Sequence, residues 1–332
     1  MGRPNLFNYA TSELSQDAFI CWLLEWANPQ HREADRELNQ CALKFVDALF
    51  DKGNKKVPSQ IDRVEIQQQH KNIDVMCIVN KRYAILIEDK VATVNHSNQL
   101  VRYLKDLAEE YPREKIIPIY LKTIEQGDYS DVKEKEFGVF LRKDFLNVLE
   151  SYRGQNPILL DYRGYLQDIS REVEAYLTKP IDDWGYYQWM GFYLRLQDEL
   201  RPTGNSSWDY VPNPSGGFMG FWWHVQQDNS VACGQYLQLE EGKLCFKIWV
   251  TNRSERAVLR QKWHEIIIRC GRKHGLGLDK PARFGNGEYM TVCQLKGDYR
   301  AADEKSVIDM EETIQILKRA ETVLDEARKM NS

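Results

Sequence analysis

The chain has 332 residues and a mass of 39.0 kDa, which is enough for two domains or one large one. Its hydrophobic content of 42% and charged content of 28% are typical of a soluble globular protein, and no apolar run approaches the ~20 residues that cross a membrane. The net charge of −4 argues against a protein that is basic throughout, although a local basic surface remains compatible with it.

The first predicted helix begins after Thr11 or Ser12, because either hydroxyl can cap a helix N-terminus. The stretch from Ala18 to Trp26 is strongly apolar, and its aromatic and leucine residues recur at helical spacing. Glu13 has two interpretations. It suits the positive end of the helix dipole, which is the commoner use of Glu there, or it reaches the acidic cluster described below.

Three strands are predicted next, over Arg63 to Gln69, Ile73 to Val79 and Tyr83 to Ile87. Only residues 80–82 separate the second strand from the third, so these two form a tight β-hairpin. In an antiparallel hairpin with this turn, the numbers of paired positions sum to 161 or 162. The third strand is apolar on both faces, which predicts a sheet covered by helices on both sides.

The open end of this hairpin gathers charged side chains. The pairing places Asp74 opposite Ile87 or Glu88, with Cβ atoms of opposed residues about 5 Å apart. Lys90 shares a face with Glu88 because strand side chains alternate. A divalent cation would relieve the repulsion between the carboxylates, and an oxygen-ligand site of this kind suits Mg²⁺ or Mn²⁺. The simpler alternative is a structural ion pair at the end of a strand. Glu65, in the first strand, is a weaker acidic candidate.

A second helix is predicted from Asn95 to Tyr111, followed by a buried strand over residues 115–121. Gln99 and Tyr103 are four residues apart and therefore lie on one face of that helix. The amide of Gln99 suits a phosphate or a metal-bound water, although a single Gln on a helix is more often solvated. The predicted order is thus helix, three strands, helix, strand.

Over roughly residues 5–125 this order and its polar residues resemble the PD-(D/E)XK nuclease superfamily, particularly a bacterial branch with an N-terminal Glu helix. Ile73 stands where the motif often has Pro, and Asp89 is acidic where many relatives carry an uncharged residue. The matching segments are Glu13 with Cys21-Trp22-Leu23-Leu24, Asn72-Ile73-Asp74, Ile87-Glu88-Asp89-Lys90, and Asn98-Gln99-Leu100 with Tyr103.

The resemblance implies an α/β fold, with a restriction-endonuclease-like αβββαβ core and a mixed central sheet flanked by helices. It implies that Asp74, Glu88 and the backbone carbonyl of Asp89 bind Mg²⁺ or Mn²⁺, with Glu13 as an outer ligand. Lys90 would then orient or deprotonate the water or stabilise developing charge, and the two adjacent carboxylates favour the electrostatic role. Gln99 would orient water or phosphate, and Tyr103 would contact nucleic acid.

The function that this resemblance implies is metal-dependent hydrolysis of phosphodiester bonds, in DNA more than in RNA. The resemblance, and nothing else in the sequence, implies a bacterial setting such as phage defence. The alternative is a protein that keeps the nuclease fold but is catalytically silent, or active only with a partner, and serves in nucleic-acid binding or interaction.

We expect a first domain over residues 1–180 and a second, α+β domain over residues 181–332, with a linker at Lys179 to Asp183. The second domain would serve substrate binding, regulation or dimerisation. Its predicted elements are a helix over 184–193, strands over 217–226, 232–239 and 243–250, a helix over 254–274, a strand over 289–296 and a closing helix over 304–330.

Three features of the second half each have two interpretations. The helix after Thr251 is rich in basic residues, which either contact a nucleic-acid backbone or form a solvated face. Aromatic residues at 218–223 stack on bases or, as their alternation favours, fill the core of a sheet. Apolar residues of the closing helix form a homodimer seam or pack on their own sheet, and Glu321 interrupts that stripe. The residues proposed for the backbone contact are Arg256, Arg260, Arg269 and Lys273.

The seven cysteines are scattered singly, with no Cys-x-x-Cys pair. An odd number without zinc-ligand spacing predicts reduced thiols rather than a disulfide framework. The first residues also lack the apolar core of a signal peptide. We therefore expect a cytoplasmic protein.

Overall fold

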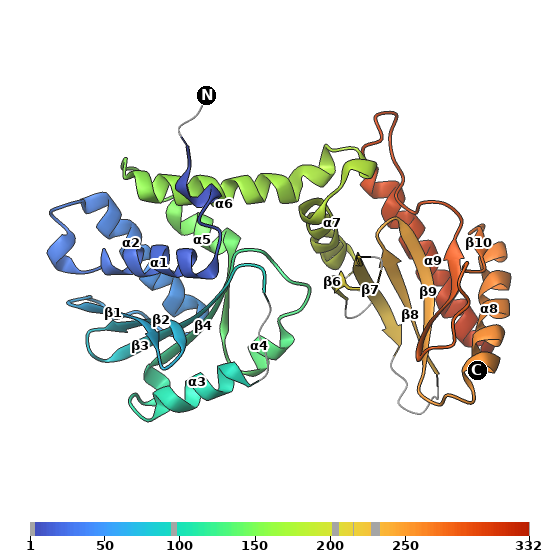
Figure 1. Cartoon of the computed structure of the whole chain (residues 1–332), viewed down its shortest axis with the longest axis horizontal. Helices are drawn as coiled ribbons and strands as arrows, with labels where there is room; N and C mark the ends of the chain where they lie inside the picture. Colours follow the sequence, from blue (N-terminus) through green and yellow to red (C-terminus); the bar gives the residue numbers. More distant parts are fainter. Residues whose placement is uncertain (1–3, 94–97, 201–205, 215, 227–232, 332) are drawn as a thin grey trace. The chain divides into compact units, whose positions relative to one another are not determined.

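The computed structural model describes residues 4–93, 98–200, 206–214, 216–226 and 233–331. The chain forms two compact units, Met1–Ser170 and Arg171–Ser332 (Figure 1). This division falls within a helix, α6 (Pro157–Glu174), and precedes the boundary expected at residue 180, which stays a prediction. Each unit is built around its own sheet.

The first unit contains a mixed five-stranded sheet in which the strands follow one another in chain order. The first three strands pair antiparallel, and the third, fourth and fifth pair parallel. The αβββαβ core and mixed sheet expected from the sequence are therefore confirmed. The strands are β1 (Val64–His70), β2 (Ile73–Val79), β3 (Tyr83–Lys90), β4 (Ile116–Lys122) and β5 (Gly138–Leu141).

The β2–β3 hairpin has the predicted register. Val79 pairs with Tyr83, and the numbers of all the paired positions sum to 162. Asn80 and Lys81 form the turn with φ angles of 54° and 53°, and the N–H of Arg82 donates to the carbonyl of Val79 at 3.0 Å. The short turn thus fixes which side chains lie opposite one another along both strands.

Helices cover both faces of this sheet, as Figure 1 shows. On one face, α1 (Glu13–Glu25) and α2 (Arg36–Lys52) contact the sheet and α5 (Arg142–Leu149) packs on α2; on the other lie α3 (Gln99–Ala108) and α4 (Ser130–Glu134). The first residues of the helix predicted over 95–111 lie outside the described residues. The helix α2 was not predicted, although Asp35 caps it by accepting from the N–H of Leu38 at 2.9 Å.

The second unit contains a six-stranded antiparallel sheet. Its spatial order is β10 (Leu278–Asp279), β11 (Tyr289–Leu295), β9 (Lys243–Val250), β8 (Cys233–Glu240), β7 (Phe218–Gln226) and β6 (Ser207–Val211). Its helices are α7 (Tyr186–Glu199), α8 (Arg256–Lys273) and α9 (Met310–Asn331). The strands β6 and β10 were not predicted, and α9 begins six residues later than expected.

The interior of the second unit bears on two of the alternatives left by the sequence. Phe221 and Trp223 are fully buried and form sheet core, whereas Phe218 and Trp222 are half-buried, so that stacking of these two on bases stays a prediction. Leu317 and Leu324 of α9 are also fully buried within the unit. Glu321 interrupts their stripe because it accepts a hydrogen bond from the indole N–H of Trp223 at 2.8 Å.

Two expectations from composition can also be compared with the structure. All seven cysteines are free thiols, as their spacing predicts. Within the described ranges, no helix combines the length and the apolar character that a membrane span requires.

Candidate active site

The hairpin and its neighbouring strand place the predicted residues on one face of the sheet. Because Val75 pairs with Ile87, the next residues along the strands, Asp74 and Glu88, lie side by side. Lys90 follows on the same face as Glu88. This face is the one covered by α3, since Met76 and Leu86 on it pack against Leu100 and Tyr103.

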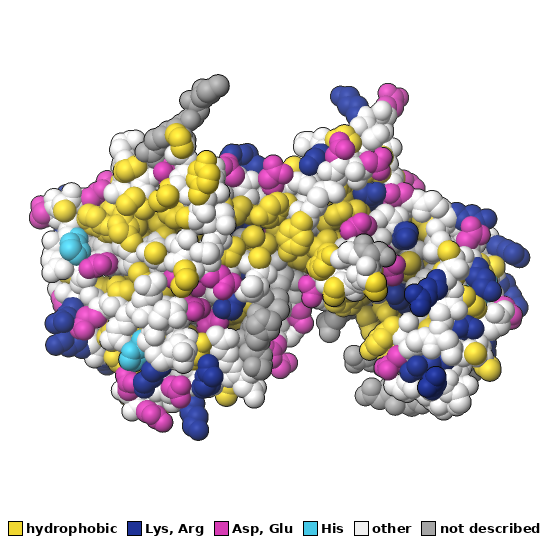
Figure 2. All heavy atoms as spheres, in the orientation of Figure 1, with side chains coloured by type: hydrophobic (Ala, Val, Ile, Leu, Met, Phe, Trp, Pro, Cys, Tyr) yellow, Lys and Arg dark blue, Asp and Glu magenta, His cyan; other side chains and the backbone are white. Residues whose placement is uncertain are grey.

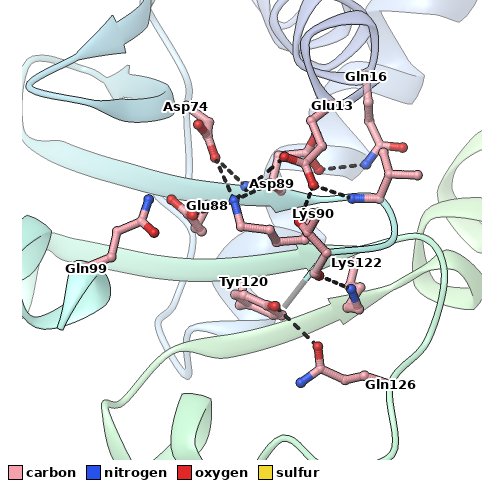
Figure 3. Close-up of polar contacts among 12 residues, drawn as sticks. Glu13, Gln16, Asp74, Glu88, Asp89, Lys90, Gln99, Tyr120, Lys122 and Gln126 are labelled. Carbon is pink, nitrogen blue, oxygen red and sulfur yellow. Dashed lines mark hydrogen bonds and ion pairs between the residues drawn. The ribbon is translucent and has the colours of Figure 1, made fainter. Parts of the chain in front are cut away.

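The ammonium of Lys90 lies at the centre of the cluster (Figure 3). Its Nζ is 2.6 Å from Glu88 Oε1, 3.8 Å from Asp74 Oδ2 and 3.9 Å from Glu13 Oε2. Glu13 comes from the first turn of α1, so three elements contribute carboxylates to one point. The structure therefore brings together the three acids and the lysine that the sequence selects.

Hydrogen bonds fix two of these carboxylates. The backbone N–H of Asp89 donates to Asp74 Oδ2 at 2.9 Å. Glu13 Oε1 accepts from the N–H of Val91 at 3.3 Å and from the hydroxyl of Thr93 at 2.5 Å. The second oxygen of Glu13, Oε2, faces the ammonium of Lys90.

Burial and like charge shape the protonation of the cluster. Burial, followed by the neighbouring charge of Asp74, raises the pKa of Glu88 to about 7. Burial acts to lower the pKa of Lys90, but the ion pair with Glu88 and the other nearby carboxylates outweigh it, so that this pKa is raised. Lys90 is therefore a stable cation that balances the acids around it.

Among the described residues, no three His, Cys, Asp or Glu side chains are arranged closely enough to hold a metal ion. The donor set nevertheless fits one. Glu88 is fully buried, and neither of its oxygens has a well-directed hydrogen-bond donor; the short contact with Lys90 is ionic. The carbonyl of Asp89 faces the same ammonium and accepts from it at 3.0 Å. A buried carboxylate whose close partner is a single ammonium, beside a second carboxylate and a carbonyl, is a ligand set typical of Mg²⁺ or Mn²⁺.

Gln99 and Tyr103 form one edge of the cluster on α3. The Gln99 side-chain amide donates to the Tyr103 hydroxyl at 2.5 Å. Burial is the first cause that raises the pKa of Tyr103, and the charges of Glu88 and Asp74 add to it. The predicted pair on one helix face is thus observed next to the acids.

A buried polar network behind β3 was missed from the sequence. The carboxylate of Asp89 lies on the opposite face of the strand and accepts from the Gln16 amide at 2.6 Å. Gln16 Oε1 in turn accepts from the hydroxyls of Thr123 at 3.0 Å and Tyr162 at 2.8 Å. Burial raises the pKa of Asp17 to about 7. Burial, together with the charge of Asp17, also raises the pKa of Asp89. The spacing of Gln16 and Asp17 from Glu13, at helical i+3 and i+4, was the available signal.

Lys122 was also missed. It is fully buried on β4, pairs with Lys90 across the parallel strands and donates to the carbonyl of Thr93. Burial is the main reason that the pKa of Lys122 is lowered to about 8. The signal in the sequence was a lysine directly after an apolar strand.

Several candidates lie elsewhere. Glu65 pairs across the sheet with Ile78, four residues along β2 from Asp74, so it does not join the cluster and that weaker prediction is wrong. The basic candidates of the second unit have mixed surroundings: Arg256 and Arg260 bind backbone carbonyls, Lys273 pairs with Glu326, and Arg269 is exposed. Their contact with nucleic acid stays a prediction.

Comparison with known proteins gives one match. The family model described as the PD-(D/E)XK nuclease superfamily matches residues 4–181, which is more than half of the chain. No curated protein and no solved structure matched.

Proposed function

The chain belongs to the PD-(D/E)XK nuclease superfamily, and we propose from this premise that it is a metal-dependent nuclease that hydrolyses phosphodiester bonds. The observation that carries the proposal is the convergence of Asp74, Glu88 and Glu13 on Lys90 at one edge of a buried sheet. Burying like charges together costs free energy through desolvation and repulsion, and such clusters are typical of catalytic sites.

We assign the metal ligands to Asp74, Glu88 and the carbonyl of Asp89, with Glu13 as an outer ligand. When bound, Mg²⁺ or Mn²⁺ supplies an activated water and neutralises charge on the phosphoryl group. The carboxylates of Glu88, whose oxygens lack a well-directed hydrogen-bond donor, and of Asp74 are the groups that would turn to it. The hydrogen bond from the N–H of Asp89 keeps Asp74 directed at that position.

Lys90 acts in this proposal as a fixed positive charge. Because its pKa is raised by the surrounding acids, it holds its proton and cannot remove one from water. An ammonium within hydrogen-bond reach of a phosphate oxygen stabilises the negative charge that builds up in the transition state. This role requires that Lys90 stay charged while the substrate binds.

Gln99 and Tyr103 are assigned to the substrate. The Gln99 amide is held by Tyr103, which leaves its carbonyl oxygen to orient a water or a phosphate-bound group. The substrate is a nucleic acid, as superfamily membership implies, and we favour DNA over RNA.

The decisive experiment incubates the full chain with linear, circular and single-stranded DNA and with RNA, in Mg²⁺, Mn²⁺ or EDTA. We expect cleavage of at least one DNA substrate that requires metal and that Glu88→Ala abolishes. The silent-protein alternative predicts no cleavage and no metal binding by wild type. Activity that persists in Glu88→Ala would reveal a contaminant or a different site.

A further inference from the structure

One segment of this acidic chain carries a net positive charge. Residues 251–297 contain ten Lys or Arg and four Asp or Glu, a net charge of +6, whereas the whole chain carries −4. The segment comprises α8, β10, β11 and the loops between them. Figure 2 shows Lys and Arg side chains gathering on the side of the second unit that carries α8.

Part of this charge maintains the fold. Arg256 donates to the carbonyl of Val250 at 2.9 Å and so fixes the start of α8. Arg260 donates to the carbonyl of Phe284 at 3.2 Å and holds the loop after β10 against the helix. These two arginines are therefore committed to the protein itself.

Other basic side chains surround a hollow between the end of α8 and β10. Its volume is about 510 Å³, and its charged lining residues are Arg272, Lys280, Lys296 and Asp279. Lys296 and Asp279 pair at 3.3 Å, with both side chains more than half exposed. Arg272 and Lys280 are exposed and have no acidic partner within the described part of the chain. The hollow thus has an excess of positive charge that the protein does not balance.

Contacts with Phe284 and Val292 hold part of the lining of the hollow in place. Lys280 Nζ lies 4.4 Å from the centre of the Phe284 ring, which also contacts Arg260 at 4.3 Å. His264 Nδ1 lies 2.7 Å from the carbonyl oxygen of Val292. Since a carbonyl oxygen only accepts, Nδ1 carries the hydrogen and donates it. Gly275, at φ +67°, has open space where a side chain would be, so the rim is unobstructed.

We propose that this hollow binds phosphate groups of a nucleic-acid backbone through Arg272, Lys280 and Lys296. The identity of the polyanion rests on the proposed nuclease function. Arg272 and Lys280 have no acidic partner among the described residues, and Lys296 forms an exposed ion pair with Asp279. Clustered Lys and Arg are the elements that phosphate binding requires. None of the four residues first selected on α8 lines the hollow, and Arg256, Arg260 and Lys273 already have partners in the protein.

The test measures binding of a fluorescent DNA duplex to the full chain in EDTA, so that nothing is cut, at several salt concentrations. The variant combines Arg272→Ala, Lys280→Ala and Lys296→Ala. The matched control combines Lys305→Ala, Lys318→Ala and Lys329→Ala, three exposed lysines of the same unit outside the hollow. For each phosphate group that the variant no longer neutralises, the slope of log affinity against log salt should become shallower by about 0.9.

We expect the slope of the hollow variant to be shallower than that of wild type by about 2 to 3, and its affinity to be at least about tenfold lower. The control should match wild type in both. Equal affinity and slope in both variants would overturn the inference, as would failure of wild type to bind DNA. A parallel cleavage assay separates the two proposals. If wild type binds through the hollow but cuts nothing, the nuclease proposal fails alone; if it cuts and the hollow variant binds normally, this inference fails alone.

Discussion

Lys90 and Lys122 lie opposite each other on the parallel strands β3 and β4, and the protein shifts the pKa values of their ammonium groups in opposite directions. Both are buried, which favours the neutral amine. For Lys90, the ion pair with Glu88 and the other nearby acids outweigh burial and raise the pKa. For Lys122, burial prevails and lowers the pKa to about 8. Ion pairing at 2.6 Å is what distinguishes the two lysines.

This difference predicts a pH-dependent stability. The pKa of Lys122 is about 8 in the folded state against an ordinary value of 10.5, so between these pH values the unfolded chain binds more protons. The cost of the buried charge is fully present below pH 8 and is relieved as the pH rises. Relative to Lys122→Met, wild type should gain about 2 to 3 kcal/mol in its free energy of unfolding between pH 7.5 and 10. Urea denaturation in EDTA measures this; a difference that is constant with pH would contradict it.

Lys90 is predicted to be essential for cleavage. Lys90→Ala removes the only cation that contacts Glu13, Asp74 and Glu88 within the described residues. Loss of one charge that stabilises the transition state should lower kcat at least about 10²-fold. Circular dichroism should report an intact fold. Lys105→Ala, an exposed lysine of α3, is the control and should keep full activity. Cutting at the wild-type rate by Lys90→Ala would refute the assignment.

Metal binding should stabilise the protein through Glu88. If Mn²⁺ binds only the folded state, a concentration 100 times its Kd adds about 2.7 kcal/mol to the free energy of unfolding. Glu88→Gln should abolish this gain, because a neutral amide replaces a buried ligand whose oxygens have no other donor. Glu134→Gln, at an exposed position of α4, should respond to Mn²⁺ as wild type does. Thermal denaturation with and without Mn²⁺ is the measurement.

The central part of the site could be predicted because it depends on local rules. A short turn at Asn80 and Lys81 fixes the hairpin register, and the register brings Asp74 beside Glu88. Alternation along β3 then places Lys90 on the same face. None of these steps requires knowledge of contacts between distant parts of the chain.

The rest of the site depends on contacts that local patterns do not encode. Gln16 and Asp89 are 73 residues apart in sequence, and only the packing of α1 on the sheet brings them together. Lys122 is adjacent to Lys90 because β4 pairs parallel with β3, and that register is set by tertiary packing. The helix α2 is an exception, because Asp35 marks its start and its buried residues recur every three or four positions, so the local pattern that predicts it was present in the sequence.

The closing helix carries a polar contact whose removal should be costly. Glu321 is buried and accepts from the indole N–H of Trp223. Glu321→Leu would continue the apolar stripe of α9 but leave that buried donor unsatisfied, at a cost of about 1–3 kcal/mol. Glu321→Gln keeps an acceptor oxygen and should lose less. Urea denaturation of both variants decides between them, and a Leu variant as stable as wild type would contradict this account.

The network behind β3 should position the catalytic strand. Gln16→Ala leaves Asp89, Thr123 and Tyr162 without their shared partner, at about 1–3 kcal/mol for each group. Because Asp89 lies between Glu88 and Lys90, and Gln16 lies one turn after Glu13, the site loses alignment, and kcat should fall by up to about 10²-fold with KM little changed. Tyr162→Phe removes one donor and should cost about 0.5–1.5 kcal/mol while sparing kcat. Equal kcat in wild type and a folded Gln16→Ala protein would mean that the network serves stability alone.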